Sequence, residues 1–195
     1  MLRDTGAVEP PRYPVGTWKA DPTHSEIAFS IRQLAGTVRG RFTDYDITLV
    51  TREDPTRSSV TASIDLMSID TGNARRDKHL RTADLAGAAR FPTMSYHSVG
   101  ISRSDGRWTV DGELTLKGVT CRMPLAMEPA DSDPDSDPDS DSDSDSDSAG
   151  NFARFSARAQ LHRRDFGIGI PMDVGGIVVS GKISVSLTVH AVLQE

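Results

Sequence analysis

Runs in which apolar and polar residues alternate recur along nearly the whole chain, and they limit its fold more than any other feature. Successive side chains of a β-strand point to opposite faces, so alternation with a period of two is typical of a strand with one buried face. The run at 26–33 places Ile27, Phe29 and Ile31 on one face. Similar runs begin near residues 15, 38, 60, 93, 107, 119, 152 and 178. The sequence therefore predicts an all-β protein with about eight strands.

Short turns join most of these runs. Asp105-Gly106 is typical of a tight hairpin, and Lys117-Gly118 separates the next two runs. Consecutive hairpins in this number are best accommodated by closing the sheet, because closure leaves no unpaired edge strand. We therefore expect an extended eight-stranded antiparallel up-and-down barrel, with a two-sheet sandwich as the alternative.

The exception to this pattern is Ser68–Arg81, where strand-like residues give way to a short charged helix between the expected fourth and fifth strands. Asn73 is a candidate N-cap, and Leu80 is the obvious apolar anchor. A helix this short is not stable alone in water, so it must dock on the barrel.

The charges of this helix admit two interpretations. Arg76, His79 and Arg81 could bind an anionic head group near one mouth of the barrel. Alternatively, the arginines pair with carboxylates that pin the turn across the barrel end, and we favour this interpretation. The carboxylates in question are Asp70, Asp77 and Asp84.

The domain organisation follows from composition. Residues 1–14 are rich in proline and predict a flexible N-terminal leader, and residues 15–195 predict a single barrel domain. An Asp/Ser-rich insert at 131–150 interrupts this domain and is expected to be disordered. Its nine aspartates account for the formal charge of −6, because 22 basic residues against the remaining 19 acidic ones give +3. No nucleic-acid partner is expected from so mild a balance.

Other sequence features exclude several classes of protein and of functional site. Cys121 is the single cysteine, which excludes an internal disulfide framework and a cysteine-based metal site. The five histidines are not spaced as metal ligands, and no nucleophile-elbow motif is present. We expect no integral membrane segment and no signal peptide, hence a cytoplasmic protein, or a periplasmic or secreted one if the true start lies upstream.

Four stretches in order resemble motifs of the YceI-like lipid/polyisoprenoid-binding family. They are His24–Arg32, then Ser68–Asn73 running into Arg76–Arg81, then Gly112–Thr115 with Gly118–Thr120, and Arg164–Ile168. The resemblance covers about 15–193 apart from the insert. It implies a lipocalin-like barrel with an elongated apolar pore that holds a long-chain amphiphile, and it implies no catalytic activity.

From the residues and the resemblance together we expect a non-enzymatic protein without a cofactor. It would hold a polyisoprenoid, an isoprenoid quinone or a fatty-acyl lipid, for sequestration or transport, with a stress-response role and a homodimer left open. The alternatives are a lipid-modifying isomerase or hydrolase that uses the same cavity, and a packed barrel with a scaffold role. The residues expected to line the pore are Phe29, Ile31, Phe42, Ile64, Leu114, Phe155 and Leu187.

Overall fold

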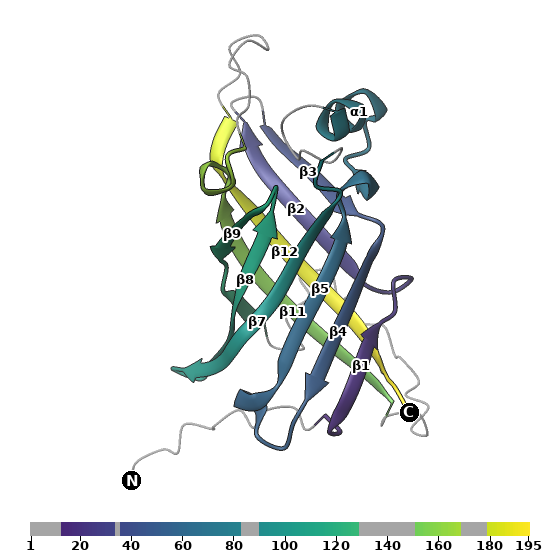
Figure 1. Ribbon diagram of the computed structural model, residues 1–195, viewed down its shortest axis with the longest axis vertical. Helices are drawn as coiled ribbons and strands as arrows, with labels where there is room; N and C mark the ends of the chain where they lie inside the picture. The colour runs from purple at the N-terminus through teal and green to yellow at the C-terminus, as the bar shows by residue number, and fades with distance from the viewer. Residues whose placement is uncertain (1–12, 34–35, 83–89, 129–150, 169–178) are drawn as a thin grey trace, which may run out of the picture.

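A computed structural model of the chain describes residues 13–33, 36–82, 90–128, 151–168 and 179–195. The strands are β1 (Gly16–Ala20), β2 (Glu26–Gln33), β3 (Gly36–Phe42), β4 (Tyr45–Thr51), β5 (Ser59–Asp65), β6 (Ile69–Asp70), β7 (Thr93–Ser104), β8 (Arg107–Leu116), β9 (Val119–Arg122), β10 (Leu125–Glu128), β11 (Phe152–His162) and β12 (Val179–Leu193). One α-helix, α1 (Ala74–Thr82), stands at one end of the barrel (Figure 1).

These segments form a closed eight-stranded antiparallel barrel, because several of them continue one another along a single line of the wall. β1 and β2 both pair with β12, and β3 and β4 pair with β2 and β1 respectively. In the same way β6 continues β5, and β9 and β10 together line the edge of β8. The pairing of β1 with β12 closes the ring.

The predicted antiparallel barrel with one short helix is therefore confirmed. β1 and β2 lie end to end in one strand of the eight-stranded wall, as do β3 and β4, and β5 and β6. Counted in this way, α1 follows the third strand of the wall rather than the fourth. Residues 1–12 of the expected leader and the insert at 131–150 lie outside the described residues.

Two hairpin turns have the left-handed backbone that their sequences predict. Asp105 and Gly106 have φ of 50° and 78°, and Lys117 and Gly118 have φ of 56° and 75°. Positive φ at both central residues gives a turn whose twist matches that of the flanking strands. These two turns set the register of β8 against β7 on one side and β9 on the other.

The main core occupies the interior of the barrel. It is built from side chains at alternate positions of the strands, such as Ile47, Ile64, Leu114 and Val189, each less than a tenth exposed. Burying such side chains contributes roughly 1.5–3 kcal/mol each. The same alternation determines which residues can meet a ligand inside the barrel.

Candidate functional site

A set of apolar residues runs across β3, β2 and β12 on the inward face of the wall. Cross-strand pairing places these side chains in three rows, since directly paired residues point to the same face. We call them the inner rows; they are Val38, Ile31 and Ile183; Gly40, Phe29 and Val185; and Phe42, Ile27 and Leu187. On β11 the rows end at alanines and a leucine, which are Leu161, Ala159 and Ala157.

The inner rows differ from the rest of the core in their exposure. Phe29, Ile31, Val185 and Leu187 are only half-buried although they share a face with the fully buried Ile27. A well-packed barrel interior leaves few voids larger than a water molecule. Solvent therefore reaches an apolar surface inside this section of the barrel.

The expected pore-lining residues are divided by the fold. Four of them, Phe29, Ile31, Phe42 and Leu187, belong to the inner rows. Ile64 and Leu114 are fully buried in the core of the other strands, and Phe155 is half-buried near the β1 end.

Gly40 is a residue of the inner rows that sequence patterning did not single out. The Phe29 ring lies over it, so that a Cβ at this position would stand 2.5 Å from Phe29 Cζ and 2.8 Å from Thr71 Cγ2. Phe29 also packs against Phe42, with ring centroids 5.6 Å apart. A glycine inside an alternating strand often marks a close approach of this kind, which is the only signal the sequence offered.

Beside this glycine, the described residues leave one side of β3 without a paired strand, and we call this side the gap beside β3. β3 pairs with β2 along its whole length, but among the described residues β6 pairs only with Arg41 and Phe42. Residues 36–40 therefore have a described strand neighbour on one side only. α1 stands at this end of the barrel, where it contacts β6 (Figure 1). The inner rows and this gap lie at the same end of the molecule.

The turn before α1 is held by a buried carboxylate. Asp77 is 6% exposed and accepts hydrogen bonds from the N–H and the hydroxyl of Thr71. Asn73 caps the helix as predicted, because its side chain accepts from the N–H of Arg76 at 3.0 Å. The turn is thus fixed from both sides, and the Thr71 methyl group, like the Phe29 ring, lies close to Gly40.

The expected mouth residues are on α1, but their partners differ from those the sequence suggested. Arg76 donates to the hydroxyl and carbonyl oxygens of Thr71, and Arg81 donates to the carbonyl of Ile69 at 2.6 Å. Asp70 interacts with Arg41 of β3. These two arginines thus donate to oxygens of Thr71 and Ile69. The hydrogen bond from the Gly72 N–H lowers the pKa of Asp70 most, and the charge of Arg81 helps to lower it. Asp84 lies outside the described residues. His79 is exposed.

The opposite end of the barrel holds an aromatic cluster. Trp18 is fully buried, and its Nε1 donates to the Thr51 hydroxyl at 2.9 Å. Tyr13 packs edge-on against Trp18 and lies 4.5 Å from the ring of Phe155. Its hydroxyl donates to the carbonyl of Arg154. The interior is therefore filled with large rings at the β1 end, in contrast to the inner rows.

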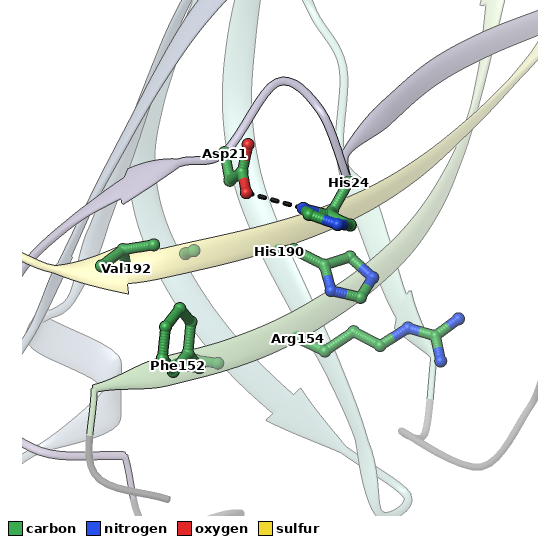
Figure 2. A pocket seen from close by; sticks show the side chains of 8 residues that line it. Asp21, His24, Phe152, Arg154, His190 and Val192 are labelled. Carbon is green, nitrogen blue, oxygen red and sulfur yellow. Dashed lines mark hydrogen bonds and ion pairs between the residues drawn. The ribbon is translucent and has the colours of Figure 1, made fainter. Parts of the chain in front are cut away.

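A groove of about 450 Å³ lies on the outer side of the wall, where the turn between β1 and β2 crosses β11 and β12 (Figure 2). His24 and His190 face one another across it, with ring centroids 6.2 Å apart. The residues that line it are Asp21, His24, Phe152, Ala153, Arg154, His190, Ala191 and Val192.

The turn at this groove has a structural task. The Asp21 N–H donates to the carbonyl of His190, and the Ser25 hydroxyl both donates to that carbonyl and accepts from the His190 N–H. This clamp lets β1 and β2 pair with the same strand in different registers. The Asp-x-x-His-Ser segment is therefore accounted for by folding.

The same turn predicts an acid-sensitive step. Hydrogen bonds from the Thr23 hydroxyl, the His24 ring and the Thr23 N–H lower the pKa of Asp21 from 3.8 to about 2. Because the folded-state pKa is the lower one, the stabilisation is complete above pH about 4 and is lost as the pH falls toward 2. We expect the melting temperature of Asp21→Asn to fall less steeply than that of the wild type as the pH drops from about 4 to about 2, since Asp54 and Asp70, whose pKa values are also lowered, still contribute. A profile that falls as steeply in the variant as in the wild type would contradict this.

The described part of the chain offers few other candidates for a functional site. There, no three His, Cys, Asp or Glu side chains are grouped so that they could hold a metal ion. No described helix is both long and apolar enough to cross a membrane. Cys121 is a half-buried free thiol.

Comparisons with known proteins agree with this geometry. The family model of the YceI-like domain matches residues 18–191. Protein YceI of Escherichia coli O157:H7 is 30% identical over 174 residues, which are 88% of this chain and 83% of that protein. Protein YceI of Salmonella newport is 28% identical over 197 residues, covering 100% of this chain and 94% of the other.

Solved structures show the same fold. BcnA of Burkholderia cenocepacia superposes with a TM-score of 0.68 at 18% identity, over 90% of this chain and 99% of that one. A polyisoprenoid binding domain from Saccharophagus degradans superposes with a TM-score of 0.65 at 15% identity, over 93% and 100% of the two chains.

The fold and the inner rows define a class: an antiparallel up-and-down barrel with apolar surface accessible inside one end. Within that class, the chain belongs to the YceI-like family.

Proposed function

We propose that this protein binds a long-chain amphiphile, with the apolar chain against the inner rows, and that it sequesters or transports this ligand without chemical change. The ligand class is a polyisoprenoid, an isoprenoid quinone or a fatty-acyl lipid. The observation that carries the proposal is the half-exposure of Phe29, Ile31, Val185 and Leu187 on the inward face. The name of the Saccharophagus degradans relative supports the choice of class.

The energetics favour a chain rather than a polar ligand. The inner rows offer aliphatic and aromatic surface, and burying apolar area contributes roughly 25 cal/mol per Å². Ligand pockets of this kind are lined mainly by hydrophobic side chains and need few polar contacts for orientation. None of the residues of the inner rows carries a carboxylate or an imidazole, which supports binding over catalysis.

Extraction and probe uptake test this proposal together. We expect organic extraction of the purified protein, followed by mass spectrometry, to release a long-chain amphiphile. We also expect the delipidated protein to take up fluorescent isoprenoid or fatty-acyl probes at about one per chain. A protein that yields no lipid and takes up none of these probes would be a packed barrel, and the proposal would fail.

A further inference from the structure

Positive charge is concentrated at the end of the barrel that holds the gap beside β3. Arg32 and Lys182 are exposed on the outer face, where both flank the paired residues Ile31 and Ile183. Arg39 is exposed one row away on β3. We call the exposed cations of this end the basic end face; they are Arg32, Arg39, Arg75, Lys78, Arg164 and Lys182.

The carboxylates nearest the gap do little to offset this face. Asp77 is buried against Thr71, and Asp70 accepts from the Gly72 N–H and interacts with Arg41. The exposed side chains of Arg32, Arg39 and Lys182 therefore place positive charge on the outer face of β2, β3 and β12, on the same strands as the inner rows.

The acidic insert joins the described strands at the opposite end of the barrel. β10 ends at Glu128 and β11 begins at Phe152, which pairs with Val192 beside the β1 end of the barrel. The nine aspartates of the insert are therefore attached at the end away from α1. The chain is therefore polarised along its long axis, with the basic end face at one end and the attachment points of the acidic insert at the other.

We propose that the basic end face docks on anionic lipid bilayers and presents the gap beside β3 to the membrane. The partner follows from two neighbouring features: cations attract the negative surface of a bilayer, and the inner rows beside them suit its acyl chains. A nucleic acid would use the cations but not the apolar interior. The acidic insert, repelled by the same surface, would help to orient the barrel.

Vesicle sedimentation tests this docking. We expect binding to vesicles of phosphatidylcholine mixed with phosphatidylglycerol, and none to phosphatidylcholine alone. Each cation near the surface contributes about fivefold to binding. A variant with Arg32→Gln, Arg39→Gln and Lys182→Gln should therefore bind at least tenfold more weakly. Raising the salt from about 0.1 M to about 1 M shortens the screening length from about 10 Å to about 3 Å and should abolish binding.

A matched control removes three exposed arginines from the other end. Arg52→Gln, Arg57→Gln and Arg107→Gln change the net charge equally, so unaltered binding would show that position matters. Replacing the nine aspartates of the insert by asparagine should strengthen binding. Equal loss in the two arginine variants, or equal affinity for duplex DNA and for anionic vesicles, would overturn the proposal.

The inference rests on the proposed function for its purpose, but the two fail separately. Vesicle binding is measured without any cargo, whereas probe uptake from ethanol needs no bilayer. A protein that takes up probes but ignores anionic vesicles would retain the proposed function and lose the docking surface. One that binds vesicles and takes up no probe would show the reverse.

Discussion

Replacing Trp18 by alanine should remove a large share of the free energy of unfolding of the protein. Trp18 is completely buried, and its ring packs edge-on against Tyr13 at the β1 end of the barrel. Truncating a buried aromatic side chain costs about 3–5 kcal/mol, because the cavity that remains is not refilled. Total stabilities of about 5–15 kcal/mol make this a large fraction. Denaturant titration followed by circular dichroism measures the change.

Two variants separate ring packing from hydrogen bonding. Trp18→Phe keeps most of the packing and loses the bond from Nε1 to the Thr51 hydroxyl, which should cost about 1 kcal/mol. Trp108, the other tryptophan, is half-buried in β8 and stacks against Arg103. Trp108→Ala should therefore cost clearly less than Trp18→Ala. Equal losses at the two tryptophans would show that the aromatic cluster does not anchor the β1 end.

The barrel itself could be predicted from the sequence because period-two alternation is a local property. The positions that became Ile27, Ile47 and Val189 of the core were all visible as alternate apolar residues. The turn dipeptide Asp105-Gly106 likewise has one low-energy solution, with positive φ at both residues. Closure followed from the number of hairpins and the cost of free edges.

The candidate site could be predicted only in part, because exposure inside a barrel depends on distant strands. Ile31 and Ile64 have the same local pattern, yet Ile31 is half-buried in the inner rows and Ile64 is packed in the core. Ile31 pairs with Val38, and the described residues place no second strand beside that part of β3, because β6 pairs only with Arg41 and Phe42. The partners of Arg76 and Arg81 were missed for a related reason, since backbone carbonyls are present at every residue and give no sequence signal.

Filling the accessible interior should weaken ligand binding strongly while leaving the barrel folded. Val185 lies between Phe29 and Ala159 in the middle of the inner rows and is half-buried. In Val185→Phe the larger side chain would occupy the space of the ligand chain. If it denies about 100 Å² of apolar contact, the loss is about 2.5 kcal/mol, or roughly 60-fold in affinity. Probe titration by fluorescence measures it.

The neighbouring outward position provides the control for this change. Ser186 is exposed on the outer face of the same strand, so Ser186→Phe adds the same ring outside the barrel and should leave affinity unchanged. The free energy of unfolding of both variants should lie within about 1.5 kcal/mol of the wild-type value, because Val185 borders accessible space rather than a close-packed core. If Val185→Phe binds probes as tightly as Ser186→Phe, the ligand does not lie against the inner rows, and the binding surface must be sought elsewhere on the barrel.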